Sequence, residues 1–388
     1  MNPHRVRHAH DRRDPFLHNY TEYKKHYMKK IHLWLIVVMS IFVTTLTANA
    51  EEHYHIVIGN LKYDLDDDYH TATVTGPANA VAPETVSIPS NVSYKEQSYA
   101  VTFIDSYAFS QCESLKSVTI PNGVKRIGDG CFQDCENLSS VSLPEGLNKL
   151  ESGVFRNCIN LSSITLPEGL NKLENEVFRD CINLSSITFP EDLTEIGFAC
   201  FWCCYNLSSV YLPEGLKIIR EDAFRNCKGL TSITIPQNVT EIEGFCFGDC
   251  SNLTSVSLPE GLNEIGSGAF YNCYKLNRVI ANNPVPAIIT NSSFPLDIDS
   301  KTEFLYVPKG SVEAYESSDW KYYFEKILEI DSAEVEEIGT YPTEINYSEP
   351  YEVFTLAGER VHTYFDSLSP GIYIIRQGNL TEKLSVSN

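Results

Sequence analysis

A block of 23 residues repeats along this chain and restricts its fold more than any other feature. Residues 143–165 and 166–188 are consecutive copies that match at 20 of 23 positions. The same period places one proline and one phenylalanine in each copy, at Pro121, Pro144, Pro167, Pro190, Pro213, Pro236 and Pro259 and at Phe109, Phe132, Phe155, Phe178, Phe201, Phe224, Phe247 and Phe270. Repeats of this length are typical of solenoids, in which each repeat stacks only on its neighbours.

Within one repeat, at residues 141–161, the residue types predict a strand, a turn, a second extended piece and a helical turn. Apolar residues alternate with a hydroxyl at 141–143, as in a strand with one buried face. Pro144 cannot donate to a strand ladder, and it stands second in a sequence suited to a type I turn. Two leucines three residues apart then return to the core at 147–150. Ser152 is placed to cap a helical turn whose apolar residues follow at helical spacing.

We therefore expect an α/β repeat solenoid of short parallel strands and short helical turns. About three or more repeats must stack before such a core closes, and this chain has eight. By length alone 388 residues would suit two or three domains, but the unbroken period favours one elongated array with caps. The expected domains are a β-rich cap at 51–88, eight repeats at 89–280, a second cap at 281–330, a linker at 331–345 and a small β segment at 346–388.

The repeats resemble the BspA-like leucine-rich repeats of bacterial surface proteins, whose pattern is approximately IP-x-x-V-x-x-I-x-x-x-A-F-x-x-C-x-x-L-x-x-V-x. The likeness covers about residues 86–280, and residues 92–101 resemble the family's longer first repeat, with the pattern of a small hairpin. Residues 304–315 with Trp320 are similar to the segment that closes such arrays in Bacteroides-type proteins. The resemblance implies a surface protein of Bacteroidota that adheres to host matrix proteins, epithelial cells or other bacteria.

Two alternating strand patterns near the end of the chain, at 351–361 and 368–386, are broken at Ala357-Gly358 and Pro370-Gly371. They resemble the C-terminal sorting domain of the type IX secretion system, which Bacteroidota attach to exported cargo. The resemblance implies export through the outer membrane. The alternative is a small β tail with no sorting role.

The first 50 residues have the zones of a secretory signal peptide. Lys29-Lys30 precedes an apolar stretch from Ile31, and Ala48-Asn49-Ala50 supplies small residues for cleavage. We expect a start at Met28 and cleavage after Ala50, which predicts a secreted or cell-surface protein without a membrane span in its mature form. The alternative is a membrane anchor, because the apolar run of about 17 residues is near the lower limit for a span.

The charge balance is strongly acidic. The chain carries 30 Lys and Arg against 51 Asp and Glu, a net charge of −21, and removal of residues 1–50 would leave 22 − 48 = −26. Such a surface repels nucleic acid and anionic lipid, whose binding depends on basic side chains. It is compatible with solubility, with basic partners or with divalent cations.

The twelve cysteines follow the repeat rather than a disulfide framework. Cysteine behaves as a small hydrophobe in such slots, so we predict a reduced and buried column. Neighbouring repeats would lie about 5 Å apart, which leaves bridging as the alternative. Cys203-Cys204 is the only adjacent pair, so the convergent ligands of a zinc site are missing. Eight cysteines stand three residues after the phenylalanine and three more just before it, at Cys112, Cys135, Cys158, Cys181, Cys204, Cys227, Cys250 and Cys273 and at Cys131, Cys200 and Cys246.

The sequence offers no catalytic set, so we predict a protein that is not an enzyme and needs no cofactor or metal. Histidine, the commonest general base, is absent from Thr71 through Val361. The repeated serine pairs have no base beside them, and the glutamates after the prolines form a ridge rather than a protected pair. A hydrolase would need catalytic groups in the caps, and His362 in the C-terminal segment is too isolated to support one.

Two weak metal patterns lie near the start of the repeats. Residues 64–68 carry the alternating carboxylates of a calcium loop, but Tyr69 stands in place of the glycine and Thr75 in place of the closing glutamate. We expect an exposed hairpin tip there. His53 and His55 share a strand face, and two ligands without a third make a weak metal site.

One repeat, at 190–211, departs from the others and supplies the candidate binding site. Trp202, Tyr205 and Tyr211 replace residues that are mostly polar elsewhere, and we expect all three to point outward. Exposed aromatic clusters are candidate hot spots for a protein or glycan partner. The alternative is drift on a tolerant surface.

Three functions remain open. The first is a non-catalytic, monomeric surface protein that binds a macromolecule in adhesion, with or without calcium. The second is a glycan- or nutrient-capturing surface protein, and the third is a hydrolase with its catalytic groups in the caps. A partner among host or bacterial proteins or glycans is expected, and a nucleic acid is not.

Overall fold

The computed structural model describes residues 54–290, 292–295 and 301–330, together with the strands of residues 352–386. The predicted leader at 1–50 and the predicted linker at 331–345 lie outside the described residues. None of the described helices is long and apolar enough to cross a membrane.

A five-stranded sheet with one further strand forms the N-terminal cap. Its strands β1 (Tyr54–Ile58), β2 (Leu61–Asp66) and β3 (Thr71–Pro77) are antiparallel, and β3 pairs in parallel with β6 (Gln97–Ile104). The predicted hairpin at 92–101 is formed by β5 (Asn91–Tyr94) and β6. Strand β8 (Arg126–Ile127) pairs in parallel with β6 and so connects the cap to the array.

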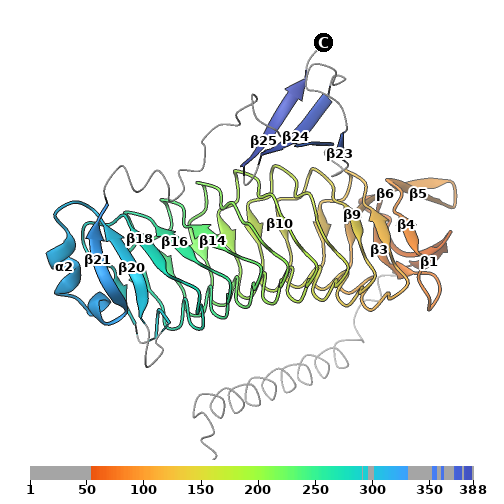
Figure 1. The fold of residues 1–388 in the computed structure, drawn as a ribbon. Coiled ribbons are helices and arrows are strands. Elements are labelled where there is room, and N and C mark those ends of the chain that lie inside the picture. Colours follow the sequence, from red (N-terminus) through yellow and green to blue (C-terminus); the bar gives the residue numbers. More distant parts are fainter. Residues whose placement is uncertain are drawn as a thin grey trace, which may run out of the picture. The chain divides into compact units, whose positions relative to one another are not determined.

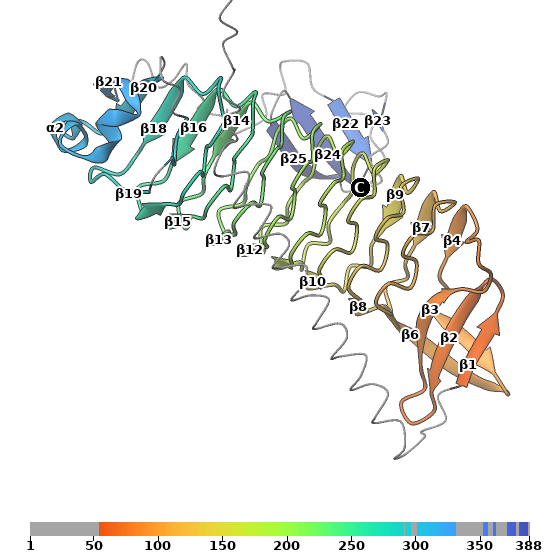
Figure 2. The ribbon, with the colours of Figure 1, turned by 90° about the horizontal axis from the view of Figure 1, so that it is seen from below.

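The array is a β-solenoid in which each 23-residue repeat makes one turn, which we call a coil. Figures 1 and 2 show the coils side by side from the cap to β21. The first strand of the coil forms the parallel sheets β4-β7-β9 and β14-β16-β18-β20-β21. These strands are β4 (Thr85–Ser87), β7 (Ser117–Thr119), β9 (Ser140–Ser142), β14 (Ser232–Thr234), β16 (Ser255–Leu258), β18 (Arg278–Ala281), β20 (Thr302–Val307) and β21 (Phe324–Glu329).

The second strand of the coil lies on another side of the solenoid. It also pairs in parallel with the same strand of the next coil, so that Lys149 lies opposite Lys172, one repeat later. It forms the sheets β10-β11-β12-β13 and β15-β17-β19. These strands are β10 (Lys149–Leu150), β11 (Lys172–Leu173), β12 (Glu195–Ile196), β13 (Ile218–Ile219), β15 (Glu241–Ile242), β17 (Glu264–Ile265) and β19 (Ile288–Ile289). Between β9 and β14 the first-strand pairing is reduced to a bridge between Thr165 and Thr188.

The predicted repeat solenoid is confirmed, but the helical turn expected in each repeat is wrong. Residues 152–157 form hydrogen-bonded turns instead of a helix. Gly153 and Asn157 have positive φ of 64° and 58°, which a right-handed helix cannot contain. The amide of Phe155 donates to Val177 of the next coil at 3.0 Å, while that of Cys158 donates to Phe155 at 3.1 Å. Backbone bonding between coils therefore replaces bonding along a helix.

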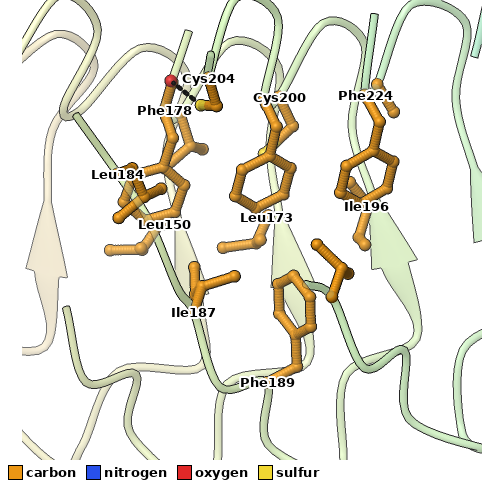
Figure 3. Packing of buried hydrophobic residues seen from close by; sticks show 14 of the residues in the cluster. Leu150, Leu173, Phe178, Leu184, Ile187, Phe189, Ile196, Cys200, Cys204 and Phe224 are labelled. Atoms are coloured by element: carbon orange, nitrogen blue, oxygen red, sulfur yellow. Dashed lines mark hydrogen bonds between the residues drawn. The ribbon is translucent and has the colours of Figure 1, made fainter. Parts of the chain in front are cut away.

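The core is a set of columns that run through the coils. The phenylalanines of the repeat are fully buried and stack with ring centroids 5.0–5.7 Å apart, and Phe294 extends the stack. Figure 3 shows Leu150, Leu173 and Ile196 lying side by side in successive coils. Each coil thus buries its apolar residues against identical or similar residues of its neighbours, as nearest-neighbour stacking requires.

The cysteine column is part of this core, and all the cysteines are free thiols. The thiol of Cys204 donates to the carbonyl of Phe178 at 3.2 Å, and the same bond recurs along the column (Figure 3). Burial raises the pKa of the Cys135 thiol to about 12. Because the thiolate is the reactive form, these cysteines act as packing groups.

Aromatic side chains close the C-terminal end around the helices α2 (Val312–Glu316) and η1 (Asp319–Tyr322). Trp320 is 1% exposed, and its indole N–H donates to the carbonyl of Ala287 at 2.8 Å. Its ring packs against Phe294 and Phe324. The predicted closing segment therefore ends the phenylalanine stack.

The last strands form a separate antiparallel sheet of order β23-β22-β24-β25. They are β22 (Glu352–Thr355), β23 (Arg360–Val361), β24 (Gly371–Gln377) and β25 (Leu380–Val386). The alternating patterns predicted at the end of the chain therefore form strands.

Candidate binding surfaces

The three predicted site residues lie on two different surfaces of the coil. Trp202 and Tyr205 belong to the turn segment that buries Phe201 and Cys204. Tyr211 follows the buried Val210 and stands in the first-strand column, one repeat after Thr188. The aromatic residues of this repeat thus mark two candidate surfaces rather than one cluster.

Trp202, which was expected to point outward, is half-buried. The guanidinium of Arg179 in the preceding coil lies 4.5 Å from its ring centroid, and that of Arg225 in the following coil lies 5.4 Å away. Such cation–π contacts contribute about 0.5–1 kcal/mol at exposed sites. Because neighbours from both sides cover the ring, Trp202 offers its edge to a partner rather than its faces.

Ion pairs hold the two arginines in place. Arg225 contacts Asp222 and Asp249 at 3.0 Å each, and Arg179 contacts Glu176 at 2.8 Å. Burial works against the charge of Arg225, but the two carboxylates outweigh it and raise its pKa. The arginines are therefore rigid.

The cation–aromatic contacts continue beyond the predicted residues. Arg225 also lies 4.7 Å from the Phe245 ring, which meets Tyr271 edge-on at 6.2 Å, and Lys228 lies 4.7 Å over Tyr205. Tyr205, Tyr271 and Tyr274 are 37%, 38% and 69% exposed. We call this surface the turn ridge, made of Arg179, Trp202, Tyr205, Arg225, Lys228, Phe245, Tyr271 and Tyr274.

Phe245, Tyr271 and Tyr274 are ridge residues that were not predicted from the sequence. Tyr271 and Tyr274 occupy the same two repeat positions as Trp202 and Tyr205 in a later coil, so the sequence contained the signal for them. Phe245 also departs from its column, which holds Ala199 and Asp222 in the preceding repeats, so the same kind of signal marks it. Its backbone has a φ of 52°, which is unusual for a bulky residue.

A column of left-handed residues supports the base of the turn ridge. Asp134, Asn157, Asp180, Cys203 and Asn226 have φ values between 58° and 64°. The Asn157 side chain donates to Asp134 at 3.0 Å, and that of Asn226 donates to the Cys203 sulfur at 3.2 Å. A hydrogen bond with Cys203, followed by burial, raises the pKa of Tyr205. These contacts fix the backbone from which the ridge side chains project.

The second-strand side of the coils is occupied by ion pairs within the chain. Glu151 is 8% exposed in its side chain and contacts Arg126 at 2.7 Å and Lys149 at 3.0 Å. Opposite charges then alternate along the coils through Glu174, Lys172, Glu195, Arg220 and Glu243. Since these charges already neutralise one another, this side is the poorest candidate for a charged partner.

Replacing Glu151 with glutamine should lower the free energy of unfolding by about 1 kcal/mol at neutral pH and by much less in acid. Burial alone would raise the pKa of Glu151, but hydrogen bonds with Lys149 and Arg126 outweigh it and hold the pKa below its usual value. The folded pKa is therefore below the unfolded value of about 4.3, so the charge stabilises the fold above that pH and the contribution fades as pH falls through the folded pKa. Urea unfolding of both proteins at pH 7 and pH 3 measures the difference. An equal difference in the free energy of unfolding between the two proteins at pH 7 and pH 3 would contradict this explanation.

Within the described residues, no group of three histidine, cysteine or carboxylate side chains could hold a metal. Residues 64–66 end β2, where Leu65 is buried, and the exposed hairpin tip predicted here is formed by residues 67–70. Tyr99 donates to Asp67 at 2.6 Å, and this hydrogen bond, followed by burial, raises the pKa of Tyr99 to about 12. His55 pairs with Asp64, and His53 lies outside the described residues.

A family model, the BspA type leucine rich repeat region, matches this chain in six copies over residues 102–231 and 217–298. None of the curated proteins matches it. A leucine rich repeat protein of T. pallidum is 27% identical over 57% of this chain and 91% of that one, with a TM-score of 0.40. A leucine rich cell surface protein of Faecalibacterium prausnitzii is 20% identical over 76% and 100%, with a TM-score of 0.44. A leucine-rich repeat protein of Bacteroides capillosus is 30% identical over 34% and 96%, with a TM-score of 0.32.

The two matched ranges of the family model together span residues 102–298, just over half of the 388 residues. The matched part contains the phenylalanine stack, the cysteine column and both candidate surfaces. The chain therefore belongs to the BspA-type leucine-rich repeat family.

Proposed function

We propose that this protein is a non-catalytic adhesion protein, secreted or held at the cell surface, whose turn ridge binds a protein partner on a host cell or another bacterium. The composition of the ridge is the observation that carries this proposal. Tryptophan, tyrosine and arginine are the residues most enriched at binding hot spots.

The rigidity of the ridge supports this role. Arg179 and Arg225 are held by ion pairs and sandwich Trp202, so a partner would not have to order these long side chains on binding. Ordering such side chains costs about 0.5–1.5 kcal/mol each at an interface. A preformed ridge therefore binds more tightly than a mobile one of the same composition.

The proposed location depends on the two ends of the chain. The apolar segment before Ala50 has the pattern of a signal peptide, and residues 346–388 resemble a type IX sorting domain. The F. prausnitzii structure similar to this one is described as a cell surface protein. We infer the same place for this chain, with export through the C-terminal segment.

The acidic balance further restricts the partner. With a net charge of −21, the chain disfavours nucleic acid and anionic lipid. We propose a monomer that meets its protein partner through aromatic contacts on the ridge, with basic groups of the partner near its carboxylates.

Replacing Tyr205 and Tyr274 together with serine should weaken capture by the protein partner about tenfold or more, because truncated hot-spot residues cost about 2 kcal/mol or more. The full chain, wild type and variant, would be tested against immobilised fibronectin, fibrinogen and epithelial-cell surface proteins, with affinity measured by surface plasmon resonance. Both tyrosines are exposed, so the fold should not change.

Tyr69 provides a matched control, because it is 80% exposed at the hairpin tip of the cap and lies far from the ridge in the sequence. Tyr69→Ser should bind as the wild type does. Equal binding by the wild type and the ridge variant would exclude the turn ridge as the binding surface, and a protein that captures none of the targets would count against adhesion.

A further inference from the structure

The first-strand side of the coils carries a different kind of surface, centred on Tyr211. This side chain is 62% exposed. The same repeat position holds Thr188 in the preceding coil and Thr234 in the following coil. Within the described residues, no lysine, arginine or aromatic ring packs against the Tyr211 ring, in contrast to Trp202. Tyr211 therefore presents an open ring face.

Two glutamates accompany Tyr211 at equivalent positions of neighbouring coils: Glu214 stands three residues after Tyr211, and Glu191 stands three residues after Thr188. Burial, followed by the negative charges of Glu191 and Glu214, raises the pKa of Tyr211. Both glutamates are exposed and belong to the turn that follows the first strand. Exposed carboxylates therefore follow the strand column that holds Tyr211, and they can accept hydrogen bonds from a partner.

Hydroxyl groups extend from Tyr211 across the coils on both sides. We call the outward positions of the first strand, from β4 to β16, the strand face. Apart from Tyr211, these positions hold only serine and threonine. The hydroxyl of Ser117 donates its proton to that of Thr85 at 3.1 Å, and both oxygens can still accept hydrogen bonds. The strand face consists of Thr85, Ser87, Ser117, Thr119, Ser140, Ser142, Ser163, Thr165, Ser186, Thr188, Ser209, Tyr211, Ser232, Thr234, Ser255 and Ser257.

The chemistry of this face favours one class of partner. An open aromatic ring stacks on the C–H face of a sugar ring, carboxylates accept hydrogen bonds from its hydroxyls, and uncharged hydroxyls continue the contact along a chain of sugars. The strand face lacks the desolvated apolar centre that protein hot spots need. Glu191 and Glu214 repel an anionic polymer, so charge complementarity selects an uncharged one.

We propose that the strand face binds a neutral polysaccharide that runs across successive coils, with Tyr211 as the stacking platform. Neighbouring strands of a sheet lie about 4.8 Å apart, which is close to the advance of one sugar in an extended glycan, so successive sugars meet equivalent hydroxyls. This site lies on a different surface from the turn ridge and does not depend on the function proposed for that ridge.

Affinity electrophoresis of the full chain tests the proposal. The gels would contain barley β-glucan, galactomannan or soluble starch as neutral polymers, and polygalacturonate or heparin as acidic ones. At least one neutral polymer should retard the wild-type protein, and the acidic polymers should not. Tyr211→Thr, which restores the residue of both neighbouring coils, should weaken the retardation about tenfold, the loss expected for one stacking contact.

Tyr274→Thr on the turn ridge is the matched control and should migrate as the wild type does. A Tyr211→Thr protein that is retarded as strongly as the wild type would overturn the proposal, and so would retardation by the acidic polymers or by none of the neutral ones. Protein capture by the turn ridge should be unchanged in Tyr211→Thr, so failure of this site and failure of the ridge are distinguishable.

Discussion

Replacing Phe178 with alanine should lower the free energy of unfolding by about 3–5 kcal/mol, the cost of removing a fully buried aromatic ring. Phe178 is 0% exposed and stacks between Phe155 at 5.7 Å and Phe201 at 5.4 Å. Its amide donates to Cys200 at 2.8 Å and its carbonyl accepts from Cys204, so the backbone is held at both ends of the residue. The neighbouring coils therefore cannot collapse into the cavity.

Chemical denaturation followed by circular dichroism measures this loss, with Tyr274→Ala as the control. Tyr274 is 69% exposed, so its truncation should change stability by about 0.5 kcal/mol or less. Because each coil contacts only its neighbours, hydrogen exchange should accelerate mainly between Phe155 and Phe201. A loss below about 1 kcal/mol would mean that the stack is not a main source of stability.

Deleting residues 166–188 should leave a folded protein that is one coil shorter, whereas deleting residues 166–177 should abolish cooperative folding. The full deletion brings Lys149 opposite Glu195 and Phe155 beside Phe201, which are the partners of the deleted Lys172 and Phe178. The half deletion leaves only residues 178–188 between residue 165 and the next coil, so the columns on the two sides of this junction no longer match. Inward residues then meet outward ones at the junction, and the array is divided into two blocks that cannot stack on each other.

Size-exclusion chromatography, far-ultraviolet circular dichroism and resistance to protease distinguish the two deletions. The shorter protein should elute as a monomer with a sharp unfolding transition, and the half-deleted protein should be digested or aggregate. Similar behaviour of the two proteins would show that the 23-residue register does not control folding.

The repeat architecture could be predicted from sequence because the same residue types recur at the same positions. Phe155 and Cys158 alone would be ambiguous, but their recurrence in each copy identified them as core columns. The helical turn was wrong because local spacing carries no information on bonds to the next coil, such as that from Phe155 to Val177.

The candidate surfaces were predicted only in part for a related reason. Trp202, Tyr205 and Tyr211 stand out in sequence because they differ from their columns. Their division between two surfaces depends on the path of the chain around the coil. Arg179 and Arg225 pack against the Trp202 ring, although each is one full repeat away from Trp202 in the sequence. Residue type alone does not predict such contacts between coils.

The parallel register between Lys149 and Lys172, which continues to Glu195, has an evolutionary consequence. A duplicated segment of one repeat length enters the array with all its columns already matched, as the near-identical residues 143–165 and 166–188 illustrate. Gain or loss of such a segment by recombination would change the length of the array while leaving both caps intact. The length of this protein is therefore a trait on which selection can act in single steps.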